Sequence, residues 1–244
     1  MKLLNSILHG LNAPPAPPAW THIWRGDVLS VTGANVNSAA DQVGTLTISS
    51  GAVKPTTVIL PGASARRGWR GLIVGGPQYL SGDPLAPEIM TSGAVAYVVL
   101  VPAFLPGGAP MIYAAGGLAG APVTPEISEV HLGLVAPPPG ELGRRDAGGV
   151  ADVFGPAAPL GVLYDVVHTW TPVLTELYLN GVLVASNAIA QPTGNIQRWT
   201  IAGDPGHTFG FPSGAQFGEA RTANVKKTAA EAATFHADRL AYYF

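Results

Sequence analysis

Short apolar runs, separated by glycine and proline along most of the chain, are the feature that most constrains its fold. Gly and Pro account for 31 and 23 of the 244 residues, and both interrupt helices and end strands. The runs between them are rich in Val, Ile, Leu, Thr and Tyr, which favours β-strands. Strands at this spacing, without long helical patterns between them, predict an antiparallel sandwich rather than a parallel α/β sheet. The candidate strands are Thr45–Ser50, Thr56–Leu60, Gly71–Val74, Ala94–Val101, Met111–Ala114, Ile127–Val135 and Gly161–Trp170.

Two local signals stand out in the C-terminal third. Asn180-Gly181, between LYL and VLVA, predicts a type I′ hairpin, because both turn residues need positive φ and these two tolerate it best. Thr228 with Glu231 three residues later forms a capping box. The Ala-rich run that follows predicts one short helix ending at about Ala241. Two further candidate strands lie between these signals, Gln197–Ala202 and Gln216–Val225.

Composition excludes several classes of protein. Charged residues make up only 11% of the chain and the formal net charge is -2, so a large basic face for nucleic acid is not expected. A chain that is 47% hydrophobic is too apolar for intrinsic disorder. Because there is no cysteine, disulfides, thiolate zinc sites and a cysteine nucleophile are excluded. No stretch reaches the roughly 18 consecutive apolar residues of a membrane span.

Residues 1–19 differ from the rest, and we interpret them as a Pro-rich N-terminal arm ahead of a single domain at 20–244. The prolines of this segment favour extended polyproline II. The alternative is a terminal strand packed on its own domain. As a secretory signal the segment is poor, because Asn5, Ser6 and His9 interrupt its apolar run. The apolar residues expected to dock on another subunit are Leu3, Leu4, Ile7, Leu8, Leu11 and Trp20.

Residues for catalysis or metal binding are not apparent, and we expect a protein that is not an enzyme and uses no cofactor. The best acidic pair, Glu126 and Glu129, has a spacing that places its carboxylates on opposite faces of a strand, which argues against glycoside hydrolysis. The six histidines are scattered, so no metal site is assigned. Neither a G-x-S-x-G elbow nor a phosphate-binding glycine loop occurs.

Exposed aromatic rings are the usual platforms for sugars, and the chain offers two candidates. Trp69 and Tyr79 are candidates for stacking on a glycan, with core packing as the alternative for each. Trp170 and Trp199 lie within strand-like runs and are expected in the core.

Three short basic segments interrupt the otherwise weakly charged chain. They are expected to be solvated loops, and the alternative is contact with an acidic partner surface. They are Arg66-Arg67 with Arg70, Arg144-Arg145 and Lys226-Lys227.

Several of these segments, taken in order, resemble one known superfamily. The hairpin Leu177–Ala185 (LYLNGVLVA), the strand segment Phe217–Arg221 (FGEAR) and the helix from Lys227 to Leu240 are similar to the laminin-G-like branch of the concanavalin A-like jelly rolls. Upstream, Gly68–Leu80 and Ala94–Pro102 look like a strand pair and the central strand of that family.

The resemblance extends from Trp20 to Phe244 and departs from the family at Val74, where an aromatic residue is usual. It implies an all-β fold: a two-sheet antiparallel jelly-roll sandwich, concanavalin A-like, with one short C-terminal helix and an extended N-terminal arm. The same sandwich serves lectins, glucanases, adhesion modules and viral structural proteins, so the resemblance alone does not decide function.

Low charge together with the arm indicates a surface covered by neighbouring subunits. We therefore expect a non-enzymatic virion structural protein, a bacteriophage capsid decoration, spike or tail component anchored by the arm. Its partners would be other virion proteins and copies of itself, with no nucleic acid and no membrane span. Its location would be the virion, assembled in the host cytoplasm, with secretion as the alternative. The alternative function is a carbohydrate-binding lectin-like module that attaches to host surface glycans.

Overall fold

The strands and the helix follow from a computed structural model that describes part of the chain. The described residues are 20–62, 64–70, 78–86, 88–89, 91–100, 111–116, 128–133, 141–145, 153–157, 161–188, 195–201 and 216–244.

Strands dominate the described residues, in agreement with the predicted all-β class. The elements are β1 (His22–Thr32), β2 (Asn35–Asp41), β3 (Ile48–Ser50), β4 (Thr56–Ile59), β5 (Arg67–Arg70), β6 (Leu80–Gly82), β7 (Glu88–Ile89), β8 (Gly93–Leu100), β9 (Met111–Gly116), β10 (Ser128–Gly133), β11 (Glu141–Arg145), β12 (Val153–Ala157), β13 (Leu163–Thr171), β14 (Leu174–Leu179), β15 (Val182–Asn187), β16 (Asn195–Ile196), β17 (Arg198–Ile201), β18 (Gln216–Ala223) and the helix α2 (Ala229–Tyr243).

Most predicted strands are confirmed, with bounds that differ by a few residues. This applies to β3, β4, β8, β9, β10, β13, β17 and β18. The sequence did not single out β1, β2, β11 or β12, and the predicted loop at Arg144-Arg145 is instead the end of β11. The expected strand Gly71–Val74 lies outside the described residues.

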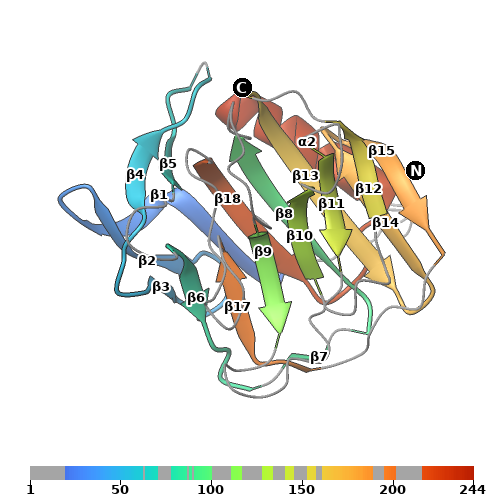
Figure 1. The fold of residues 1–244 in the computed structure, drawn as a ribbon, viewed down its shortest axis with the longest axis horizontal. Helices are drawn as coiled ribbons and strands as arrows, with labels where there is room; N and C mark the ends of the chain where they lie inside the picture. Colours follow the sequence, from blue (N-terminus) through green and yellow to red (C-terminus); the bar gives the residue numbers. More distant parts are fainter. Residues whose placement is uncertain are drawn as a thin grey trace, which may run out of the picture.

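All strand pairs are antiparallel, and one long ladder connects nearly all of them. Its order is β12-β11-β10-β9-β17-β6-β3-β2-β4-β5-β18-β8-β13-β14-β15, and β1 pairs with both β18 and β2. Figure 1 shows that this ladder folds over on itself, with β9, β10 and β11 in front of the layer that contains β8 and β13. The result is the expected pair of face-to-face sheets.

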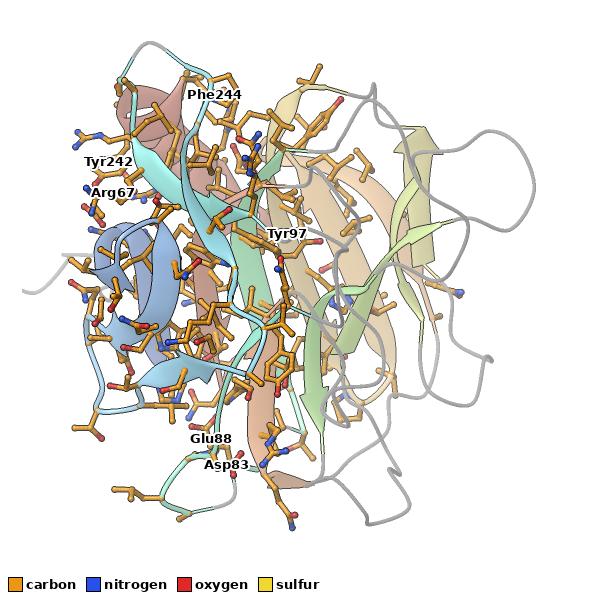
Figure 2. The ribbon with its side chains drawn as sticks, turned by 60° about the vertical axis from the view of Figure 1, so that its left-hand side comes forward. Arg67, Asp83, Glu88, Tyr97, Tyr242 and Phe244 are labelled. Atoms are coloured by element: carbon orange, nitrogen blue, oxygen red, sulfur yellow. The ribbon has the colours of Figure 1, made fainter. Side chains whose placement is uncertain are left out.

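Strand β8 explains how the layers are held together. Its side chains alternate: Val95, Tyr97 and Val99 contribute to an inner core between the two sheets, and Figure 2 shows Tyr97 pointing between them. Ala96 and Val98 contribute to an outer core on the opposite face, which α2 covers. Because both faces are buried, the strand is apolar throughout.

The helix α2 begins where the sequence predicts and lies on the outer face of the sheet. The hydroxyl of Thr228 accepts from the backbone N–H of Glu231 at 3.3 Å, and the Glu231 carboxylate accepts from the Thr228 N–H at 2.8 Å. This capping box orients the first turn. Ala232 and Phe235 then pack into the outer core.

The predicted hairpin turn is confirmed and also contacts the helix. Asn180 and Gly181 have φ values of 48° and 74°, as a type I′ turn requires. A Cβ on Gly181 would lie 2.9 Å from the Cβ of His236 on α2. Glycine is therefore needed both for the turn and for the close approach of the helix.

No helix within the described ranges is both long enough and apolar enough to cross a membrane.

Loss of the helix cap should destabilise the fold. Thr228→Ala is expected to lower the free energy of unfolding by about 1 kcal/mol, because the backbone N–H of Glu231 loses its partner. Urea denaturation followed by tryptophan fluorescence measures this change. Thr234→Ala is the matched control, since the Thr234 hydroxyl only donates to the already bonded carbonyl of Ala230 and its removal should change stability by less than about 0.5 kcal/mol. Equal effects of the two substitutions would contradict a role for the cap.

Candidate functional site

The predicted assembly arm is described only at its end. Leu3, Leu4, Ile7, Leu8 and Leu11 lie outside the described residues, so their docking and the boundary at residue 19 stay predictions. Trp20 is described and contacts its own domain. Its ring lies 5.8 Å from the ring of Phe235 on α2, with the Lys227 ammonium 4.9 Å from its centroid. Lys227 itself is buried, which corrects the expected solvated loop at that position.

Glycan stacking by Trp69 is contradicted by the structure. Trp69 is 0% exposed, and its ring stacks on Phe217 with centroids 5.5 Å apart. A ring without an exposed face cannot contact a sugar, so the core alternative holds for this residue. Trp170 and Trp199 are also fully buried, which confirms their expected place in the core.

Tyr79 lies half-buried just before β6. A Cβ on Gly51 would lie 2.5 Å from its hydroxyl oxygen, so a glycine at that position makes room for the phenol. Its stacking on a glycan stays a prediction.

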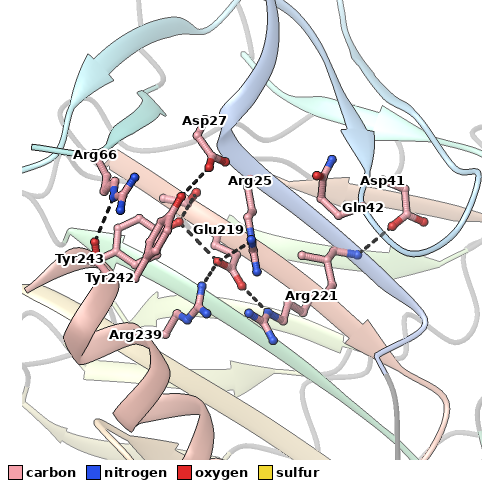
Figure 3. Close-up of polar contacts among 12 residues, drawn as sticks. Arg25, Asp27, Asp41, Gln42, Arg66, Glu219, Arg221, Arg239, Tyr242 and Tyr243 are labelled. Atoms are coloured by element: carbon pink, nitrogen blue, oxygen red, sulfur yellow. Dashed lines mark hydrogen bonds and ion pairs between the residues drawn. The ribbon is translucent and has the colours of Figure 1, made fainter. Parts of the chain in front are cut away.

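A buried glutamate on β18 organises a much larger polar group. Glu219 is 0% exposed and faces α2 rather than the inner core. Figure 3 shows its carboxylate between three guanidinium groups. Arg221 on β18 and Arg239 on α2 donate to its two oxygens, and Arg25 on β1 forms an ion pair at 3.3 Å. One carboxylate thus joins two strands to the helix.

A β-bulge sets the direction of the Glu219 side chain. The register of β18 against β8 shifts between Phe217 and Glu219, so Phe217 enters the inner core while Glu219 and Arg221 face α2. Gly218 occupies the bulge, and its carbonyl accepts from the Tyr243 hydroxyl at 2.9 Å. A Cβ there would lie 2.6 Å from the Tyr243 ring.

Toward the surface, this group continues into residues around Tyr242. The Arg66 guanidinium lies 3.9 Å from the Tyr242 ring centroid, with those of Arg239 and Arg25 at 5.4 and 5.8 Å. We call Arg25, Arg66, Arg239 and Tyr242 the arginine–tyrosine cluster. The Tyr242 hydroxyl donates to Asp27. Three guanidinium groups and one carboxylate therefore surround the Tyr242 side chain.

The cluster and the adjoining Glu219 group carry an excess of positive charge. Burial, and after it the hydrogen bond to Asp27, raises the pKa of Tyr242, although Arg66 and Arg25 oppose the shift. Burial lowers the pKa of Arg221 from its ordinary value, against the attraction of Glu219. Among the described residues, four guanidinium groups face two carboxylates, those of Glu219 and Asp27.

Sequence reasoning missed most of this cluster, although it had marked Arg66 as part of a basic segment. The available signal was Glu219 and Arg221 two residues apart in an expected strand, since such residues share a face. Arg25 and Arg239 have no local signal, because they reach Glu219 only through the fold.

A second buried group lies at the other end of the domain. Both ring nitrogens of His22 meet carboxylates, Asp41 at 2.5 Å and Glu88 at 2.6 Å. The other oxygen of Glu88 accepts from the Trp199 indole at 2.9 Å. Carboxylates only accept hydrogen bonds, so the imidazole donates from both nitrogens and is cationic. Figure 2 shows Glu88 far from Tyr242.

The pKa values of this group agree with its geometry. Burial opposes protonation of His22, but the hydrogen bonds to Glu88 and Asp41 outweigh it, and the pKa of His22 is raised from its ordinary 6.5. Burial acts to raise the pKa of Asp41, yet the bond from His22 and the backbone N–H groups of Ile23 and Val43 lower it overall.

A third polar contact joins β13 to the helix α2. His236 on α2 donates to the fully buried Asp165 of β13 at 2.5 Å. Burial raises the pKa of Asp165, against the opposing effects of His236 and Arg239. No group of three or more His, Cys, Asp or Glu residues able to hold a metal occurs in the part of the chain that the structure describes.

Comparisons with known proteins show a similarity in fold. No protein-family model and no curated protein matches the sequence. Among solved structures, Trypanosoma rangeli sialidase aligns with a TM-score of 0.62 at 12% identity, over 98% of this chain and 39% of that one. The receptor-binding domain of botulinum neurotoxin type G aligns with a TM-score of 0.59 at 9% identity, over 90% and 51%. The binding domain of Paraclostridial Mosquitocidal Protein 1 aligns with a TM-score of 0.60 at 10% identity, over 88% and 52%.

The chain therefore spans about half or less of each of these proteins. At such low identity the likeness concerns the fold alone. It confirms the concanavalin A-like fold that the sequence motifs predicted.

Removal of the buried charge of Glu219 should be strongly destabilising. Glu219→Gln keeps the shape of the side chain but leaves three guanidinium groups without their shared counter-charge, and we expect a loss of about 3 kcal/mol in the free energy of unfolding. Urea denaturation at pH 7 measures it. Asp238→Asn, an exposed position on α2, is the control and should stay near the wild type. A Glu219→Gln variant as stable as the wild type would show that the carboxylate is not needed.

The His22 group should make stability depend on pH. Because the pKa of His22 is raised, its contribution is fully present below 6.5 and is lost as the pH rises through the folded-state pKa. His22→Asn should remove this decline from the profile of unfolding free energy between about pH 6 and 9. Parallel profiles for the two proteins would rule out His22 as its source.

Proposed function

We propose that the protein is a non-catalytic carbohydrate-binding module. The observation that carries the proposal is the fold: the chain aligns along most of its length with parts of a sialidase, with the receptor-binding domain of a neurotoxin and with the binding domain of a mosquitocidal protein. A binding role fits this sandwich, whose interior is packed and whose surface and loops remain for recognition.

The carboxylates of the three polar groups described above support a role without catalysis. Glu219 is held by arginines, Asp41 and Glu88 by His22, and Asp165 by His236. Hydrolysis of a glycosidic bond needs a pair of acids free to contact the substrate. The buried acids named here are already engaged with cations of the protein itself.

The virion role expected from the sequence depends on the arm at 1–19 and on partners that are not part of this chain. It stays a prediction, and the carbohydrate-binding alternative is the one that the fold favours.

A glycan array with the full chain tests this function. We expect saturable binding with a clear preference among sugars, confirmed for the best ligand by titration calorimetry and without release of sugar from it. Absence of binding to every glycan, at protein concentrations up to about 1 mM, would exclude a useful affinity, since that Kd corresponds to only about 4 kcal/mol. Co-sedimentation with virus particles at a fixed copy ratio would then favour the virion role.

A further inference from the structure

The arginine–tyrosine cluster holds more cationic hydrogen-bond donors than the protein can satisfy. Each guanidinium has five N–H donors, and the carboxylate of Glu219 is already shared by Arg25, Arg221 and Arg239. The Tyr243 hydroxyl also lies 3.4 Å from it. Glu219 therefore has little capacity left for further bonds.

One of these donors is buried and unused. The Nε atom of Arg239 is shielded from solvent and makes no hydrogen bond with the described residues, whereas the buried Nε of Arg25 faces a Glu219 oxygen at 3.3 Å in an ion pair. The Arg239 side chain is almost completely buried. An unpaired buried donor is destabilising, and a cationic one more so, so the group as it stands favours the approach of an anion.

Solvent reaches one side of the cluster. The Arg25 side chain is 29% exposed, and Arg66 and Tyr242 are half-buried. Arg66 forms no ion pair with a described carboxylate, and its one protein hydrogen bond runs from Nε to the carbonyl of Tyr242 at 3.3 Å. Its terminal nitrogens are thus available to a ligand.

The acid beside Tyr242 already accepts a hydrogen bond from the protein. Asp27 keeps its negative charge while it accepts the hydroxyl of Tyr242, and the four guanidinium groups still outnumber the two carboxylates, so the local charge is positive. Tyr242 acts as a positioning residue, because Arg66 stacks on its ring and a second group cannot take the same face.

From this geometry we propose that the arginine–tyrosine cluster binds the oxyanion of an acidic sugar, a carboxylate or a sulfate, through Arg66 and Arg25. Planar guanidinium groups suit such oxygens because they donate two parallel hydrogen bonds. Arg239 and Arg221, which are buried, add positive electrostatic potential at this site. The assignment of the anion to a sugar rests on the carbohydrate-binding function proposed above, whereas the anion site rests on the cluster alone.

Binding of defined oligosaccharides to the full chain tests the proposal. The probes are a heparin-derived hexasaccharide for sulfate, sialyllactose for carboxylate and lactose as the neutral counterpart, each titrated by calorimetry. We expect one acidic probe to bind at least about tenfold more tightly than lactose, with an affinity that falls as salt rises.

Variants locate the site. Arg66→Gln should weaken the affinity for the acidic probe about tenfold, because one charge-assisted contact is lost. Arg66→Lys should have an affinity between those of the wild type and Arg66→Gln, because lysine keeps the charge but cannot donate two parallel hydrogen bonds. Lys54→Gln removes the same charge from an exposed side chain bonded to Asn37 and should leave binding unchanged. Thermal melting confirms that the variants are folded.

The outcomes separate the two proposals. Lactose bound as tightly as the acidic probes, with no effect of Arg66→Gln, would overturn the anion site while carbohydrate binding stands. If no sugar binds but sodium sulfate raises the melting temperature of the wild type, and not of Arg66→Gln, the anion site stands and the carbohydrate function fails. Acidic probes that bind Arg66→Gln and Arg25→Gln with wild-type affinity would refute the proposed site.

Discussion

Burial of one carboxylate is the constraint on which the helix-covered side of this fold depends. An ionised glutamate away from water must be neutralised and hydrogen-bonded, and Glu219 meets this need with arginines from β1, β18 and α2. The three elements cannot separate without exposing unpaired charge in the interior. The position of α2 on the outer face of the sheet is thus determined by electrostatics as well as by the packing of Phe235.

The two layers of the interior are built differently. Between the sheets, the inner core consists of aliphatic and aromatic side chains. Beneath α2, the outer core is interrupted by charged contacts, the Glu219 group and the pair of Asp165 with His236. Hydrophobic packing tolerates small shifts, whereas hydrogen-bonded ions require a defined geometry. The polar contacts therefore define the register of the helix, and their excess of cations opens onto the surface at Tyr242.

The features predicted correctly from sequence are those with a local cause. The hairpin follows from Asn180-Gly181, the helix start from Thr228 and Glu231, and the buried strand β8 from its unbroken apolar run. Strand β1 was missed because Gly26 and charged residues interrupt its pattern, and its ends are supported by pairing with β18 and β2. Trp69 was a candidate for stacking on a glycan because the amino-acid sequence does not show that Phe217 stacks on its ring.

The sequence by itself determined the β class, the hairpin and the terminal helix, because alternation, turn chemistry and capping act over a few residues. The concanavalin A-like character of the sandwich came from the resemblance of its motifs to that superfamily. The tertiary structure alone decided which charged residues meet. Arg25, Arg66 and Arg239 come from distant parts of the chain and converge only when β1, the segment before β5 and α2 are assembled around β18. No spacing in the sequence encodes that convergence, because it depends on strand order and on the bulge at Gly218.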